Sequence, residues 1–118
     1  MEFMVNYDLW NIKMVSKNTL ITLYKEEQDS DEEVYFVFGM TNKAQHTIFL
    51  NEDMVEAQQI KTLKHELTHC YIWEFGLYNV PNFDEEMVCD LVASINDWIN
   101  EIVKNFKLWK EEGEIKCI

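Results

Sequence analysis

Residues 65–69 read His-Glu-Leu-Thr-His, and they fall within a stretch that is predicted to be helical. Residues four apart lie on one face of an α-helix, so the imidazoles of His65 and His69 can bind a single Zn²⁺ ion. Glu66 projects beside them and can take a proton from zinc-bound water, which makes it the candidate general base. Burying three ionisable side chains without partners is costly, and a metal ion removes that cost. The pattern therefore predicts a zinc site.

A hydrolytic zinc site needs a third protein ligand and one open position. Glu86 and Asp90 lie four residues apart, on the border of the apolar stripe of the next predicted helix. Glu85 competes for the role, but its spacing from Asn82 fits a capping box, in which it accepts from a backbone N–H. We therefore expect Glu86 to be the third zinc ligand. Asp90 is expected to accept from the ring N–H of a ligand histidine and so to orient that ring.

The elements that must position these residues are expected to be a sheet followed by helices. Alternation of apolar and polar residues, and short apolar runs between polar turns, predict a small and mainly antiparallel sheet of three to four strands in residues 1–50. The expected strands are 10–14, its hairpin partner 20–24 after a turn at 16–18, 34–38 as a strand covered on both faces, and 47–50.

Two long helices are expected after the sheet. Asn51 or Asp53 can cap the first, and Gly76 is a plausible left-handed stop for it. With 118 residues the chain is expected to form a single α+β zinc peptidase-like domain over 1–118. Its expected parts are the sheet over 1–50, an active-site helix over 51–76, a glutamate helix over 82–108 and a charged tail over 109–118.

Composition excludes several classes of protein. The chain has 22 acidic residues against 10 Lys and no Arg, a net charge of −12, so direct binding to nucleic acid is not expected. No stretch approaches the roughly 20 apolar residues of a membrane span, and the N-terminus does not resemble a signal peptide. Three Cys without a C-x-x-C pair fit a reducing compartment. A cytoplasmic location is therefore expected.

The His-Glu-x-x-His pattern followed by Glu86-x-x-x-Asp90 resembles the motif pair of the gluzincin metallopeptidases, the thermolysin-like group. The small size and the order of sheet and helices are most similar to the minimal members, the minigluzincins and the ImmA/IrrE-like peptidases. The resemblance implies a hydrolase that holds Zn²⁺ with two His and the downstream Glu. In this sequence the implied residues are His65, His69 and Glu86 as ligands, Glu66 as general base and Asp90 as support for the first histidine.

The expected activity is that of a zinc-dependent endopeptidase. Its protein substrate is expected to add as a strand beside Thr47–Leu50, because edge backbone groups bind peptides of any sequence. Tyr78 or His46 is expected to stabilise the oxyanion, and the sequence does not choose between them. The resemblance suggests a repressor protein as the partner. Little chain follows the glutamate helix, so a zinc-stabilised, inactive or latent binding module, antirepressor-like, is the alternative function.

Overall fold

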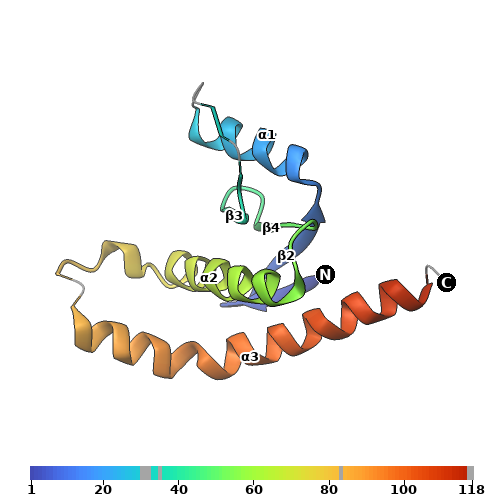
Figure 1. Cartoon of the computed structure of the whole chain (residues 1–118). Coiled ribbons are helices and arrows are strands. Elements are labelled where there is room, and N and C mark those ends of the chain that lie inside the picture. The colour runs from blue at the N-terminus through green and yellow to red at the C-terminus, as the bar shows by residue number, and fades with distance from the viewer. Residues whose placement is uncertain (30–32, 35, 83, 117–118) are drawn as a thin grey trace.

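The computed structural model is an α+β arrangement of one four-stranded sheet and three α-helices (Figure 1). It describes residues 1–29, 33, 34, 36–82 and 84–116, with side chains up to residue 113. In chain order the elements are β1 (Glu2–Val5), β2 (Asp8–Val15), α1 (Lys17–Gln28), β3 (Gly39–Asn42), β4 (Thr47–Asn51), α2 (Glu56–Glu74), the short 3₁₀ helix η1 (Leu77–Asn79) and α3 (Glu85–Lys116).

The sheet is mixed, with the strand order β1-β2-β4-β3. β1 and β2 form an antiparallel hairpin, and β3 pairs antiparallel with β4. The central pair, β2 and β4, is parallel. The prediction of a mainly antiparallel sheet was therefore wrong at its centre, because a parallel pair needs a crossover connection and α1 supplies it.

Residues 20–24, predicted to be a strand, belong to helix α1. The predicted turn before them is the helix cap: Ser16 Oγ accepts from the backbone N–H of Thr19 at 3.2 Å. A second acceptor at this end is Asp53, whose Oδ2 accepts from the backbone N–H of Lys17. Leu20 is fully buried against the sheet, so a single apolar row is enough to attach the helix.

The strand covered on both faces is β4, not residues 34–38. All five residues of β4 are buried. In the predicted strand, Val37 is buried but Phe36 and Phe38 are exposed, and the strand that follows begins at Gly39, where the predicted one was expected to stop. The predicted strand at 47–50 is confirmed, and it is one of the two inner strands of the sheet.

Helices cover the two faces of the sheet unequally. α1 packs on one face through a small cluster formed by Leu20, Val37, Met40 and Phe49. α2 and α3 pack against the other face and against each other, and they bury a larger core that includes Trp10, Ile48, Leu67, Ile95 and Phe106. Figure 1 shows α2 with α3 along one side and with β3 and β4 on the other. The helix that carries the zinc pattern is therefore held on two sides.

Helix α2 agrees with the predicted active-site helix except at its beginning. Val55 precedes its first residue, and neither Asn51 nor Asp53 caps it. Asn51 lies in β4, and its side chain accepts from the backbone N–H of Asp53. The side chain of Asp53 accepts from the backbone N–H of Lys17, at the beginning of α1. Gly76 follows the helix with φ of +67°, so the predicted left-handed stop is confirmed.

Helix α3 begins later and ends later than the predicted glutamate helix. Asp84 is its cap, because its Oδ1 accepts from the backbone N–H of Met87 at 3.0 Å. Asn82 lies outside the helix with φ of +55°, so the predicted capping box with Glu85 was wrong. The predicted tail is helical through Lys116. Tyr35 and Phe83, predicted in a strand and at a helix start, lie outside the described residues.

Within the described part of the chain, none of the helices combines the length and the apolar character that a membrane crossing requires.

Candidate metal centre

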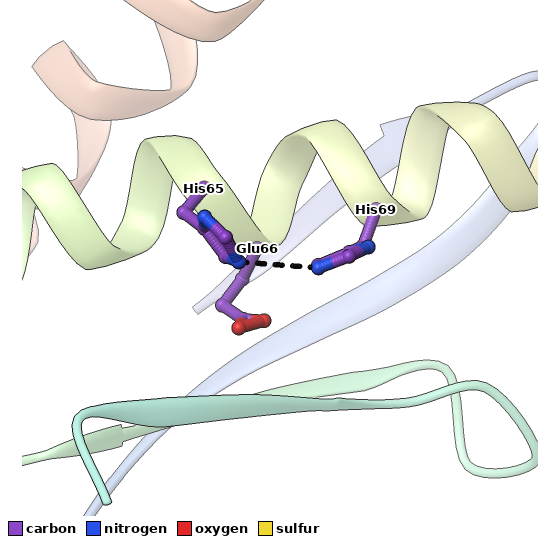
Figure 2. A group of neighbouring side chains, drawn as sticks. All are labelled: His65, Glu66 and His69. Atoms are coloured by element: carbon purple, nitrogen blue, oxygen red, sulfur yellow. Dashed lines mark hydrogen bonds between the residues drawn. The ribbon is translucent and has the colours of Figure 1, made fainter. Parts of the chain in front are cut away.

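Helix α2 presents the three residues of the zinc pattern on adjoining rows. Glu66 belongs to the buried row, one turn from Thr62 on one side and one turn from Cys70 on the other. His65 and His69 lie on the flank of that row and are exposed. Figure 2 shows all three side chains leaving α2 in the direction of β3. The helix therefore places one sheltered carboxylate beneath two accessible imidazoles.

The two imidazoles face each other at a distance suited to a shared metal ion. Nε2 of His65 and Nε2 of His69 are 3.2 Å apart, and the two rings are inclined at 75°. Tetrahedral Zn–N bonds of about 2.0–2.1 Å separate two ligand nitrogens by about 3.3 Å. A carboxylate oxygen of Glu66 lies within 4.8 Å of a ring nitrogen of each histidine. The three residues are therefore brought together, at distances compatible with a shared metal ion.

Strand β3 orients Glu66. Thr41 Oγ1 donates to Oε2 of Glu66 at 3.0 Å, and Glu66 as a whole is only 7% exposed. Gly39 lets β3 approach α2 this closely, because a Cβ there would lie 2.8 Å from Cγ2 of Thr62 and 3.0 Å from the carbonyl oxygen of Phe49. One carboxylate oxygen is thus fixed by a hydroxyl, and the carboxylate keeps a defined position beside the histidines.

Two hollows open on this side of α2. A hollow of about 600 Å³ lies between α1, residues 33–39 and α2, and its lining includes Phe36, Phe38 and His65. A smaller one of about 270 Å³ lies between α1, β3 and α2, and its lining includes Lys43 and His69. Glu66 lines both hollows. The three residues are therefore reached from the side of α1 and β3.

The structure does not bring Glu86 or Asp90 to the histidines. Among the residues that the structure describes, no further carboxylate joins the group of His65, Glu66 and His69 within 4.8 Å. Glu86 is exposed in the first turn of α3. Asp90 lines an apolar hollow of about 390 Å³ between the end of α2, η1 and α3. The cause is that the histidines point toward β3, whereas α3 packs against another side of α2.

The predicted docking strand was wrong in its position. β4 has a strand on each side, so it has no edge to which a peptide could add. β3 ends the sheet, and the backbone N–H of Asn51 donates to the carbonyl of Phe38. Because hydrogen-bonded pairs alternate in an antiparallel ladder, the backbone groups of Gly39 and Thr41 point away from β4. The strand edge beside Glu66 is therefore that of β3.

The two predicted oxyanion donors lie away from the histidine pair. His46 stacks on Trp10, with ring centroids 4.5 Å apart and planes inclined by 1°. Tyr78 stacks on Trp73 beyond the end of α2. Thr41 was not predicted from the sequence, because no local pattern marks a hydroxyl that meets a carboxylate from another element. A second group of ionisable residues, formed by Asp8, His46 and Glu74, was not predicted either.

Comparisons of this chain with models of known protein families, with curated proteins and with solved structures give no match.

Proposed function

We propose that this chain is a zinc-dependent peptidase in which His65 and His69 hold the metal and Glu66 is the general base. The observation that carries the proposal is the 3.2 Å separation of the two Nε2 atoms above a carboxylate fixed by Thr41. Structural histidine pairs do not need a sheltered carboxylate at the same point. A base in a hydrolytic site does, since it must be within reach of the reacting water.

Zinc bound at this centre would polarise a peptide carbonyl and lower the pKa of water. The protein itself positions the general base, Glu66, and shields it from solvent. The Thr41 hydroxyl engages Oε2 of Glu66, which leaves Oε1 as the oxygen that takes a proton from the attacking water. The same oxygen then delivers that proton to the leaving amine nitrogen, so Glu66 ends the cycle ionised.

The substrate in this proposal is a protein segment in extended conformation. The outward backbone groups of Gly39 and Thr41 can pair with such a segment and hold it antiparallel or parallel to β3. Side chains of the segment would enter the two hollows that flank the site, one of which is bordered by Phe36 and Phe38. Recognition through backbone groups and apolar side chains suits cleavage of flexible regions. A repressor protein is one candidate for such a substrate.

Glu86 remains the proposed third ligand. Residues 84–90 are exposed at every position, and the first buried residue of α3 is Leu91. Because the first two turns of α3 lie on another side of α2 from β3, Glu86 would reach the histidines only by a movement of the beginning of α3 around α2. Glu27 and Glu33 are the alternatives, because they line the same hollows as His69 and His65. We expect Glu86→Gln to weaken zinc binding, and the same change at Glu27 or Glu33 to leave it unchanged.

The test is cleavage of an unfolded protein by the zinc-loaded wild type and by Glu66→Gln. We expect equal zinc contents, with cleavage by the wild type alone. Glu56→Gln is the matched control, since Glu56 is an exposed residue at the beginning of α2, where it forms an ion pair with Lys110. Cleavage that survives Glu66→Gln would refute the assigned base.

A zinc-stabilised binding module is the second candidate function. It is favoured by the absence, among the described residues, of a second carboxylate beside His65 and His69 that could complete a hydrolytic site. In this alternative, zinc bound by His65 and His69 stabilises the fold, and the edge of β3 binds a strand of a partner protein that is not cleaved. Zinc retained in the wild type, tight capture of an extended peptide and no cleavage of any unfolded protein would establish it in place of the peptidase.

A further inference from the structure

A second group of potential metal ligands lies at the other end of α2. Ligand atoms of Asp8, His46 and Glu74 all lie within 4.8 Å of one another. Asp8 begins β2, His46 belongs to the turn between β3 and β4, and Glu74 ends α2. None of the three belongs to the zinc pattern. Three segments that are far apart in the sequence therefore converge with one imidazole and two carboxylates.

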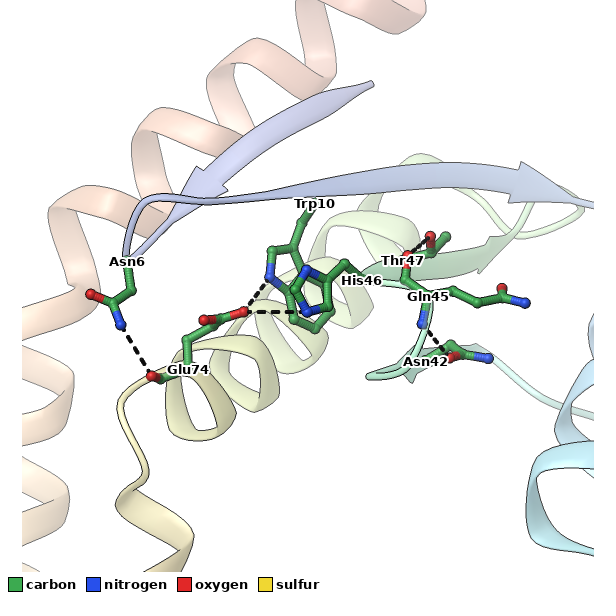
Figure 3. A network of polar contacts seen from close by, with 7 residues as sticks. All are labelled: Asn6, Trp10, Asn42, Gln45, His46, Thr47 and Glu74. Carbon is green, nitrogen blue, oxygen red and sulfur yellow. Dashed lines mark hydrogen bonds and ion pairs between the residues drawn. The ribbon is translucent and has the colours of Figure 1, made fainter.

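Trp10 fixes two members of this group (Figure 3). Its indole Nε1 donates to Oε1 of Glu74 at 2.8 Å, and its ring lies flat against that of His46. Trp10 is fully buried, so it is itself immobile. Nε2 of His46 is 3.7 Å from the same oxygen of Glu74. A hydrogen-bonded carboxylate and a ring held by stacking are features that orient ligands in metal sites.

The backbone around the group is tied down as well. The side-chain amide of Asn6 donates to the carbonyl of Glu74, which links the β1–β2 turn to the end of α2. The carbonyl of His46 accepts from the backbone N–H of Asn11 at 2.9 Å. These bonds hold Asp8, His46 and Glu74 near one another before any ion binds, so little ordering is left for binding to impose.

The group brings two carboxylates together. The side chain of Glu74 is only 6% exposed, whereas Asp8 is exposed. Two carboxylates this close repel each other unless a proton or a metal ion lies between them. Imidazole together with carboxylates selects divalent transition metals over Mg²⁺ and Ca²⁺, which prefer oxygen ligands alone.

We propose that Asp8, His46 and Glu74 form a second metal site, for a divalent transition-metal ion of the Zn²⁺ class. The ion would join the β1–β2 turn, the β3–β4 turn and the end of α2, and would stabilise the fold without taking part in hydrolysis. The site is independent of the proposed peptidase centre, because it shares no ligand with it.

The test is a Zn²⁺ titration of the full chain by calorimetry after removal of metal by a chelator. We expect about two ions per wild-type chain, and about one in His46→Asn and in the double variant His65→Ala/His69→Ala. Combining all three substitutions removes both sites. His46 has φ of +48°, a conformation that Asn adopts readily, so His46→Asn is expected to fold. Gln45→Ala, in the same turn, is the matched control and keeps both sites.

Thermal unfolding supplies the second measurement. Zn²⁺ is expected to raise the Tm of His65→Ala/His69→Ala, which keeps only the second site, and to leave the Tm of the combined variant unchanged. Mg²⁺ in place of Zn²⁺ is expected to give no shift. Two ions retained by His46→Asn, or none bound by the double variant, would overturn the second site while leaving the peptidase proposal standing. If His46→Asn loses one ion and keeps the other at His65 and His69, the second site is supported.

Discussion

The hydroxyl of Thr41 offers a direct measure of how firmly the fold holds Glu66. Thr41→Val keeps the shape of the side chain and suits a strand, but it removes the donor that lies 3.0 Å from Oε2. Glu66 is 7% exposed, so water can replace the lost donor only in part. Leaving a buried charged acceptor without this partner costs about 1–2 kcal/mol in the free energy of unfolding. For a chain of this size we expect Tm to fall by about 4–8 °C.

Urea unfolding of the metal-free protein at neutral pH is the assay, with the four single and double combinations of Thr41→Val and Glu66→Gln. We expect a coupling energy of about 1 kcal/mol, because a neutral amide loses less when the hydroxyl is removed. Thr68→Val is the control, since Thr68 donates only to the backbone carbonyl of Lys64. If Thr41→Val costs the same with Glu66 or Gln at position 66, the hydroxyl does not position the carboxylate and the reasoning fails.

Three further predictions concern packing, thiol chemistry and pH. Gly39→Ala is expected to lower the free energy of unfolding by about 1–3 kcal/mol, because its new methyl group meets side-chain and backbone atoms at 2.8–3.1 Å. Gly113→Ala, whose methyl group meets no atom within 4 Å, should raise the free energy of unfolding by up to about 0.5 kcal/mol. If urea unfolding gives the same change for both variants, the packing of β3 on α2 is contradicted. The thiol prediction uses a variant whose third cysteine is replaced by serine. Exposed Cys89 should be alkylated in the folded protein, whereas Cys70, whose pKa is raised by burial, should react only after unfolding. Peptide mass spectrometry determines which cysteine has reacted. Burial raises the pKa of Glu74 above its ordinary 4.5, so its contribution to stability is complete below that pH and is lost as pH rises through the raised value. The metal-free wild type should therefore lose stability relative to Glu74→Gln as the pH rises above about 4.5, and a difference that does not change with pH would disprove the shift.

Much of the helical part of the fold could be predicted from the sequence, because helices leave a local period. The active-site helix was placed within a few residues, and its stop at Gly76 was identified from a residue type. The error at α1 arose because the run Leu20–Tyr24 is apolar at most positions and fits a strand or a buried helix equally well. The decisive feature was Ser16, which caps a helix and had been assigned to a turn.

The candidate site was predictable only where its residues share one helix. His65, Glu66 and His69 are brought together by the helical repeat alone, so the sequence was sufficient for them. A third ligand, a strand that positions the base and an edge for the substrate all depend on how separate elements meet. The parallel pairing of β2 with β4 decides which strand is at the edge of the sheet, and no residue in either strand indicates this pairing.

The parallel pair also separates the residues between β2 and β4 from the rest of the chain, and the sequences of these two parts can change independently. Among the described residues, those that line the hollows beside Glu66 opposite α2 belong to α1, to residues 33, 34 and 36–38, and to β3 with the turn after it, all of which lie in the chain between β2 and β4 (Figure 1). Helix α2 lies outside this insert, and the larger core is built mainly from other segments. Under the proposed function, exchanging the residues between β2 and β4 would change the groups that contact the peptide while His65, Glu66 and His69 keep their places on α2. New substrates could then be acquired by changes in one continuous stretch of the gene.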